Sequence, residues 1–237
     1  MYKINQEQYK RIFGYFKPIT KNFIIGSQNV SQSFCHFSVD NFNINNFDDL
    51  PLKLKKDIQN FPIRRKIEFL AGRVCSATAL ENLLRDGEYY WRLKSSNGAV
   101  LWPNNIAGSI SHSNNFVTAV TIKLSNEVQS IGVDIEKIMS TQKAIDLSET
   151  ILKCSTPSDM IMDITHYITL VFSAQESLYK AFSSIGITLS YEDIFCIGIN
   201  KEKKTCTLHV GNPINKVFEV HFYFSKYYNL VMTYVLI

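Results

Sequence analysis

The sequence predicts an α+β fold in which each of two halves packs helices against an antiparallel sheet. A stripe of apolar residues at helical spacing runs through residues 62–86. Alternating apolar residues in 116–136, and four apolar segments separated by turns in 194–237, are typical of antiparallel strands. We expect an N-terminal subdomain over residues 1–136 and a C-terminal subdomain over residues 137–237.

The composition favours a packed protein with an anionic ligand. Of 237 residues, 46% are hydrophobic and 19% are charged. The net charge of +4 comes without a dense basic run, which argues against nucleic acid as a partner. Five widely spaced cysteines without a C-x-x-C pair argue against a zinc site or a disulfide framework. The polar N-terminus is unlike a signal peptide, and no uncharged apolar run reaches the roughly 18 residues of a membrane span, so we expect a cytoplasmic protein.

The longest helix of the first half is expected at residues 62–86. Pro62 suits a helix start and Gly87 suits the position just past a helix end. Arg65 and Arg73 are eight residues apart, a little over two helical turns, so both can flank one edge of the same groove. The alternative is that both arginines are solvated charges on the helix surface.

A run of small residues at 108–113 contains a Ser-His pair, Ser111 and His112. Small residues allow a backbone to approach a ligand closely. Adjacent residues rarely present a nucleophile to its base, and the G-x-S-x-G motif of serine hydrolases is absent from the sequence. The pair therefore indicates an anion site, or a structural histidine at the start of a strand.

Two acidic residues interrupt an apolar strand at 128–136, which we expect to form a hairpin with the strand at 116–123. In a strand, Asp134 and Glu136 point to the same face. Two carboxylates that face the same way are a natural half-site for a hard cation such as Mg2+. The alternative is an edge strand with a solvated acidic face.

A second helix carries Glu176 and Lys180. The sequence S-x-x-E at 173–176 has the form of a capping box that opens a helix. Glu176 and Lys180 are four residues apart in the order that favours an ion pair. Both residues could therefore have a purely structural role at a helix start.

Five motifs occur in one order along the chain. They are R-x2-E-F-L-A-G-R at 65–73, W-P at 102–103, G-S-I-S-H-S at 108–113, G-V-D-I-E at 132–136 and F-S-A-Q-E-S-L-Y-K-A at 172–181. Together they resemble the 4'-phosphopantetheinyl transferase superfamily, in its Sfp-like branch and most closely the enterobactin synthetase component D group. The resemblance covers residues 60–185 well and the two ends only by length and sheet character.

The resemblance implies a pseudo-symmetric fold of two similar halves with coenzyme A between them. The implied reaction moves 4'-phosphopantetheine from coenzyme A to a serine of an apo acyl, peptidyl or aryl carrier protein, and releases adenosine 3',5'-bisphosphate. Asp134, Glu136 and Glu176 match ligands of Mg2+, for which Mn2+ is an alternative. Glu176 also matches the general base, and Lys180 would stabilise the departing phosphate charge.

The resemblance also implies an anion site in the first half. Arg65, Arg73, Lys94 and His112 match positions that bind the nucleotide and its 3'-phosphate in relatives, and Ser111 would contact phosphate as well. Non-ribosomal peptide or siderophore carriers are the leading partners, polyketide and fatty-acid carriers remain open, and we expect a monomer.

Two residues depart from the family pattern. Gln175 stands where a lysine is frequent, so one cation near the metal would be missing, and Phe172 replaces a frequent tryptophan. We expect part of the carrier-docking surface at 155–169, ahead of Glu176. The competing functions are another Mg2+-dependent phosphoryl or phosphodiester enzyme, such as a nuclease, and a non-catalytic protein that binds coenzyme A.

Overall fold

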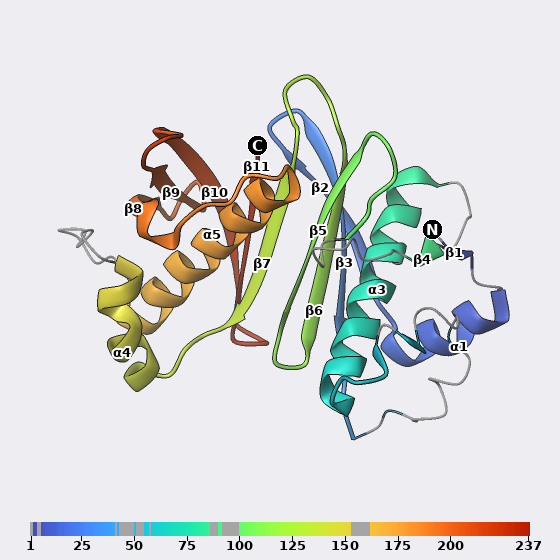
Figure 1. Cartoon of the computed structure of the whole chain (residues 1–237). Helices are drawn as coiled ribbons and strands as arrows, with labels where there is room; N and C mark the ends of the chain where they lie inside the picture. Colours follow the sequence, from blue (N-terminus) through green and yellow to red (C-terminus); the bar gives the residue numbers. More distant parts are fainter. Residues whose placement is uncertain are drawn as a thin grey trace. The chain divides into compact units, whose positions relative to one another are not determined.

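The computed structural model describes residues 2–3, 6–40, 42, 50, 55–56, 58–85, 90–91, 100–152 and 162–237. The chain divides into two compact units, Met1–Leu124 and Ser125–Ile237. Each unit has its own antiparallel sheet and at least one long helix packed on it, which confirms the predicted α+β fold (Figure 1).

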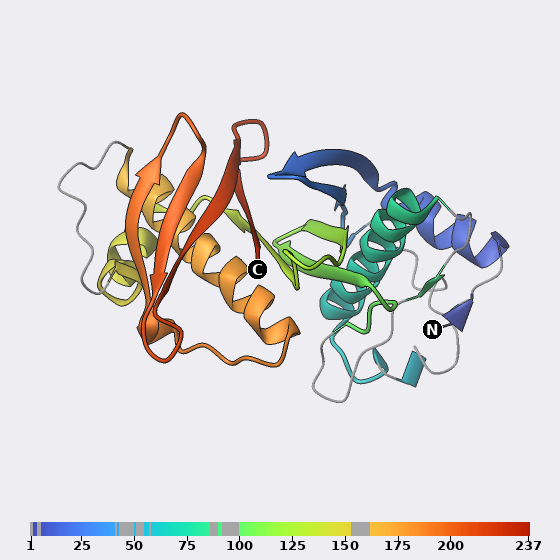
Figure 2. The same cartoon turned by 90° about the horizontal axis from the view of Figure 1, so that it is seen from above.

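Unit 1 contains a four-stranded sheet in the order β2-β3-β6-β5. Its strands are β2 (Ile19–Ile25), β3 (Gln28–His36), β5 (Ile106–Ser113) and β6 (Phe116–Lys123). Helix α3 (Ile63–Leu84) packs on β3, β5 and β6, as Figure 2 shows from above. Helix α1 (Gln6–Phe16) contacts α3, and the short strands β1 (Tyr2–Lys3) and β4 (Tyr90–Trp91) pair with each other.

The helix predicted at 62–86 is confirmed as α3. Its apolar stripe forms much of the core of unit 1, where Ile67, Leu70 and Val74 are fully buried. The helix ends at Arg85, which takes a left-handed conformation with φ of 56°.

Unit 2 contains a five-stranded sheet in the order β7-β11-β10-β9-β8. Its strands are β7 (Ile131–Lys137), β8 (Ile194–Asn200), β9 (Thr205–Val210), β10 (Lys216–Ser225) and β11 (Leu230–Leu236). Helix α5 (Ile164–Ser184) lies along one face of this sheet, and α4 (Thr141–Leu152) packs against α5. A 3-10 turn, η2 (Tyr191–Asp193), leads into β8. The four strands predicted at the C-terminus are confirmed.

The predicted hairpin between 116–123 and 128–136 is wrong. β7 pairs along its length with β11, so that Asp134 lies opposite Thr233, whereas β6 pairs with β3 and β5. After β6 the chain runs to the last strand instead, where the backbone amides of Gln129 and Ser130 both donate to the carbonyl of Ile237. The expected subdomain boundary after residue 136 falls inside β7, which belongs entirely to unit 2.

The predicted capping box at 173–176 is also wrong. Helix α5 begins at Ile164 and is capped by Asp163, whose carboxylate accepts hydrogen bonds from the backbone amides of Thr165 and His166. Ser173 and Glu176 therefore lie inside the helix. The side chain of Ser173 does not cap the helix, and it contacts β7 instead.

The cysteines that the structure describes are free thiols buried in two pairs. The sulfur atoms of Cys35 and Cys75 lie 3.5 Å apart in unit 1, and those of Cys196 and Cys206 lie 3.6 Å apart in unit 2. Over the described residues, no helix is long and apolar enough to cross a membrane.

Candidate active site

One face of β7 is directed at helix α5. A methyl group built on Gly132 would lie 1.8 Å from the backbone oxygen of Ser177 in α5, so strand and helix touch at this glycine. Side chains alternate along a strand, so Asp134 and Glu136 share the face of Gly132. Asp134 is only 2% exposed and Glu136 is half-buried. The strand therefore delivers two carboxylates toward α5.

Asp134 is a buried carboxylate held by two side chains of α5. The Lys180 ammonium lies 2.6 Å from Oδ1, and the Ser173 hydroxyl donates to Oδ2 at 2.8 Å. Ser173 is in turn 3.0 Å from the hydroxyl of Thr233 on β11. Burying a carboxylate is costly unless a cation and hydrogen bonds compensate it, and Lys180 and Ser173 supply both. Sequence reasoning assigned Ser173 to a helix cap and so missed this contact.

Glu176 lies on α5 between the two residues that hold Asp134. Residues 173, 176 and 180 are three and four positions apart, so their side chains lie on one side of the helix. Oε1 of Glu176 accepts a hydrogen bond of 2.6 Å from the hydroxyl of Tyr191. Burial, and then the bond to Glu176, raise the pKa of Tyr191, so that its hydroxyl is a neutral donor at any physiological pH. No motif in the sequence pointed to Tyr191.

The carboxylate oxygens near Asp134 are of the type that binds a hard divalent cation, although their side chains do not converge on one common position. Among the described residues, no group of three or more His, Cys, Asp or Glu side chains lies close enough to hold a metal ion. Lys180 is the positive charge beside Asp134, and Glu176 is turned toward Tyr191. Carboxylate oxygens, the donor type that Asp134, Glu136 and Glu176 carry, are nevertheless the kind of ligand that Mg2+ prefers.

Gln175 does not reach this cluster. Its side chain is 4% exposed, and its Nε2 donates to the carbonyl oxygens of Ile151 in α4 and Ile194 in β8, each at 3.1 Å. Residue 175 therefore ties the end of α4 to the start of β8. The side chain of Gln175 thus points away from Asp134, and the expectation that a cation is missing beside the metal stays a prediction.

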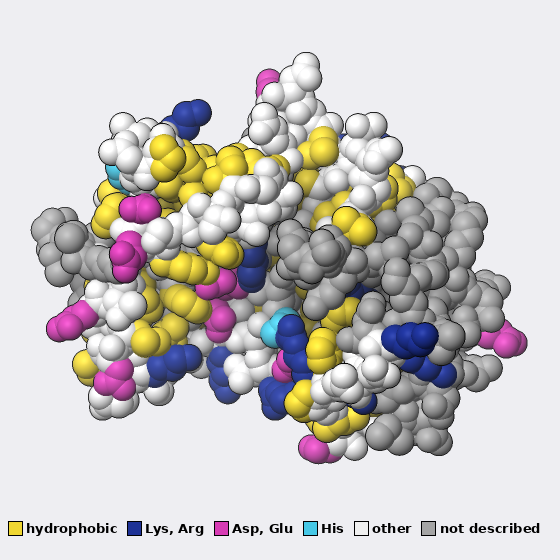
Figure 3. Space-filling view, in the orientation of Figure 1, with side chains coloured by type: hydrophobic (Ala, Val, Ile, Leu, Met, Phe, Trp, Pro, Cys, Tyr) yellow, Lys and Arg dark blue, Asp and Glu magenta, His cyan; other side chains and the backbone are white. Residues whose placement is uncertain are grey.

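In unit 1, α3 and β5 bring Arg65 and His112 together. Nη1 of Arg65 lies 2.7 Å from Nε2 of His112 and 3.4 Å from Glu68. A guanidinium can only donate, so Nε2 of His112 is the acceptor in this hydrogen bond. On the face that Figure 3 shows, a histidine side chain lies beside Lys or Arg side chains. This cluster presents guanidinium and imidazole groups at the surface of unit 1.

The other predicted anion contacts are not gathered with this pair. Arg73 is 4% exposed, with its guanidinium 4.5 Å from the centre of the Phe69 ring. Ser111 is buried and, by strand alternation, points to the face of β5 opposite to His112. Lys94 lies outside the described residues.

A neighbouring side chain leaves no room at position 108 for a residue larger than glycine. A methyl group there would lie 2.6 Å from the ring of Trp102. The two motifs at 102–103 and 108–113 therefore pack on each other, and the tryptophan ring occupies the space at Gly108 that the sequence suggested for a ligand.

Comparison with known proteins identifies the family. A family model described as the 4'-phosphopantetheinyl transferase N-terminal domain matches residues 54–122. The chain is 33% identical over 173 residues to enterobactin synthase component D of Escherichia coli O157:H7, covering 69% of this chain and 74% of that protein. It is also 28% identical over 141 residues to the 4'-phosphopantetheinyl transferase Svp of Streptomyces mobaraensis, covering 55% of this chain and 53% of that protein. The chain therefore belongs to the 4'-phosphopantetheinyl transferase superfamily, in the enterobactin synthase component D group, and is an enzyme of that class.

Proposed function

We propose that the protein transfers the 4'-phosphopantetheine arm of coenzyme A to a serine hydroxyl of an apo carrier protein and releases adenosine 3',5'-bisphosphate. The observation that carries this proposal is the buried Asp134–Lys180 pair, with Glu176 beside it on α5, inside the motifs that the family shares. Several relatives are named enterobactin synthase component D, which favours a siderophore or non-ribosomal peptide carrier as the acceptor.

In this proposal Glu176 is the general base. Its carboxylate accepts the proton of the carrier serine as the serine oxygen attacks the phosphorus that bears the pantetheine arm. The bond from that phosphorus to the oxygen of adenosine 3',5'-bisphosphate then breaks. Lys180, one helical turn after Glu176, stabilises the negative charge that collects on the leaving phosphate.

Asp134, Glu136 and Glu176 would hold Mg2+, or Mn2+ in its place. When bound, the ion supplies positive charge that neutralises the pyrophosphate. Lys180 lies where a positive charge beside Asp134 is needed, so the buried carboxylate is compensated before any cation arrives. In this position the Lys180 ammonium can leave the Asp134 carboxylate and bind a phosphate oxygen of the substrate instead.

In unit 1, Arg65 and His112 would bind phosphate groups of coenzyme A. Their side chains are within hydrogen-bond distance of each other and both are more than a third exposed. Arg73, on the same helix but buried against Phe69, stays a prediction from the resemblance. Ser111, which faces the other side of β5, and Lys94 stay predictions from the resemblance.

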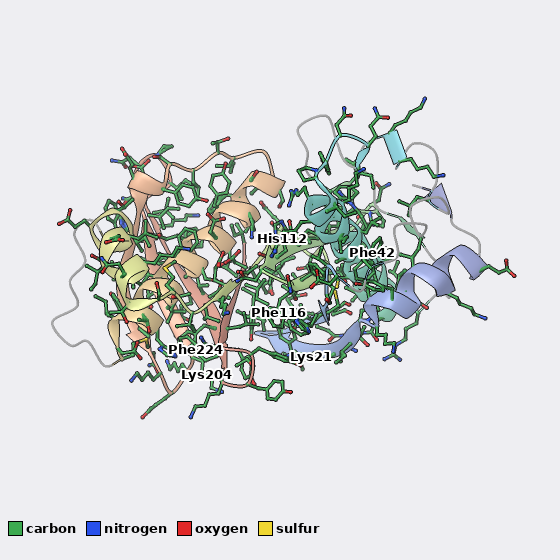
Figure 4. All side chains as sticks on the ribbon, turned by 90° about the horizontal axis from the view of Figure 1, so that it is seen from below. Lys21, Phe42, His112, Phe116, Lys204 and Phe224 are labelled. Carbon is green, nitrogen blue, oxygen red and sulfur yellow. The ribbon has the colours of Figure 1, made fainter. Side chains whose placement is uncertain are left out.

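The start of α5 would form part of the surface that receives the carrier. Of the segment 155–169, residues 162–169 are described. Beside them is a hollow of about 490 Å3, and its lining includes Lys201, Lys204, His166 and Asp163. Figure 4 labels Lys204 at this hollow together with Phe224. Carrier proteins present an acidic helix, so replacing Lys201 and Lys204 by alanine should raise the KM for the carrier and leave the KM for coenzyme A unchanged.

The direct test incubates the protein with coenzyme A, Mg2+ and each of several apo carriers, followed by mass spectrometry of the carrier. We expect one carrier to gain the mass of a single phosphopantetheine arm, only when Mg2+ is present. Free phosphopantetheine without a modified carrier would identify a phosphodiesterase instead. Coenzyme A binding without any product would support the non-catalytic alternative.

A further inference from the structure

We propose that Tyr191 positions the Glu176 carboxylate for phosphopantetheine transfer, a role that rests on the function proposed above for Glu176. The hydroxyl of Tyr191 lies 2.6 Å from Oε1 of Glu176 and is separated from it by 15 residues of sequence. A hydrogen bond to an ionised carboxylate is roughly twice as strong as one between neutral groups.

The backbone around Tyr191 is held on both sides. Tyr191 is the first residue of η2, which Ser190 caps by accepting a hydrogen bond from the amide of Glu192. At the other end, the carbonyl of Asp193 accepts a hydrogen bond of 2.7 Å from the amide of Gly211. The next residue, Ile194, is 1% exposed and begins β8. The position of Tyr191 is thus set by the sheet of unit 2.

The ring of Tyr191 is also held. It stacks on the ring of Tyr179 with centres 5.1 Å apart and planes 15° apart. Tyr179 lies one turn along α5 from Glu176, so the same helix carries both the carboxylate and the surface against which the tyrosine packs. A glutamate carboxylate otherwise rotates over a broad range about its last torsion.

The hydrogen bond therefore fixes Oε1 of Glu176 and leaves Oε2 available to a substrate or a cation. Within the part of the chain that the structure describes, Oε2 of Glu176 accepts no hydrogen bond, whereas Oε1 is engaged by Tyr191. Oε2 is therefore the oxygen that would take the serine proton or face a cation. Partners that orient a reacting or ligating group in this way are worth about 10-fold to 100-fold in activity or metal affinity.

The test compares Tyr191→Phe with Tyr227→Phe. Both substitutions delete one phenol hydroxyl, but Tyr227 is 87% exposed and lies in the β10–β11 turn. For Tyr191→Phe we expect kcat to fall about 10-fold, with the KM for carrier and coenzyme A and the thermal midpoint unchanged. Tyr227→Phe should match the wild type in all four. We also expect Tyr191→Phe to weaken Mn2+ binding, measured by electron paramagnetic resonance in the presence of coenzyme A.

A double-mutant cycle with Glu176→Gln assigns the effect. If Tyr191 acts through Glu176, Tyr191→Phe has no further effect on Mn2+ binding once Glu176 is replaced. Equal kcat in the two tyrosine variants, an additive loss in the cycle, or a variant that fails to fold would each overturn the positioning role. If the wild type transfers no phosphopantetheine, both the proposed function and the positioning role are rejected. If the wild type is active and Tyr191→Phe has the same kcat, only the role of Tyr191 is rejected.

Discussion

Asp134 is the residue on which the candidate site depends most. Its carboxylate is buried, receives Lys180 and Ser173 from α5, and shares a strand face with Glu136. Asp134→Asn keeps the size of the side chain and its capacity to accept from Ser173, but it removes the negative charge.

We expect Asp134→Asn to lower the transfer rate about 100-fold or more while coenzyme A still binds, because an essential charge of the site is lost. The rate is measured by mass spectrometry of the carrier, and binding by calorimetry. Asp146→Asn is the matched control, since Asp146 is an exposed aspartate of α4 in the same unit. Turnover near the wild-type rate in Asp134→Asn would contradict the assignment.

At the residue scale, the sequence identified the charged groups but not what holds them. The motifs singled out Asp134, Glu136, Glu176 and Lys180. They could not show that Ser173 and Tyr191 bond to two of these carboxylates, because both contacts depend on how α5 crosses the sheet. The bonds from Gln175 to the carbonyls of Ile151 and Ile194 could not be predicted for the same reason, since a helix position alone does not say which neighbour a buried side chain meets.

Among the elements, β7 and α5 form the contact that the site requires. Gly132 allows it, since any larger residue would push its Cβ into the backbone of Ser177. Gly198 on β8 has open space at the corresponding position, with no atom within 4 Å of an added methyl group.

Gly132→Ala should therefore lower the free energy of unfolding by about 3 kcal/mol or prevent folding, as expected for overpacking against backbone. Gly198→Ala should change it far less. Urea unfolding of the two variants checks this, and equal losses would show that α5 and β7 do not touch at Gly132.

The start of α5 gives a pH-dependent prediction. The Thr165 hydroxyl, and next the His166 side chain, hold the pKa of Asp163 well below its usual value of 3.8. A carboxylate whose pKa is lowered on folding stabilises the fold above its unfolded pKa, and this contribution is lost as the pH falls through the folded pKa. Above pH 5, Asp163→Ala should cost about 1 kcal/mol, the usual value of an N-cap.

That cost should shrink progressively as the pH is lowered below about 4, where the unfolded carboxyl protonates. The side chain of Asp163 is 60% exposed, so solvent screening keeps its ion pair with His166 weak and leaves the cap as the main contribution. Thermal unfolding of wild type and variant from pH 7 to pH 3 measures the difference. A constant difference over this range would mean that the charge of Asp163 is not involved.

A helix or strand could be predicted where its own residues carry the pattern, but the strand with which it pairs could not. Helix α3 was identified from its own apolar stripe and the residues at its ends. The strand character of β7 was equally clear, but its pairing with β11 joins residues 131–137 to residues 230–236. Alternation of apolar residues fixes which way side chains point and carries no information about which strand lies alongside.

At the scale of the whole molecule, the proposed site residues are divided between the two units. The carboxylates and Lys180 belong to unit 2, whereas Arg65, Arg73 and His112 belong to unit 1. The proposed function gives each unit a separate task, with catalysis and metal in unit 2 and phosphate binding in unit 1. Substitutions in unit 1 should then change the KM for coenzyme A and leave the chemical step intact.

Arg65 tests this division. Both Arg65 and the neighbouring Arg64 contact Glu68, but the guanidinium of Arg65 is close to His112, whereas that of Arg64 is close to Asn115. We expect Arg65→Gln to raise the KM for coenzyme A about 10-fold, the value of one charged hydrogen bond, with kcat at saturating coenzyme A nearly unchanged. Arg64→Gln, a loss of the same charge one residue away, should alter both constants little.

The substrate can be varied in the same experiment. If Arg65 contacts the 3'-phosphate, the penalty of Arg65→Gln should disappear when coenzyme A is replaced by 3'-dephospho-coenzyme A, because the variant and the wild type then lack the same contact. If the penalty remains with both donors, the arginine binds another phosphate of the nucleotide. A fall in kcat with an unchanged KM would contradict the separation of tasks, because an arginine of unit 1 would then act on the chemical step that Glu176 and Lys180 are proposed to perform.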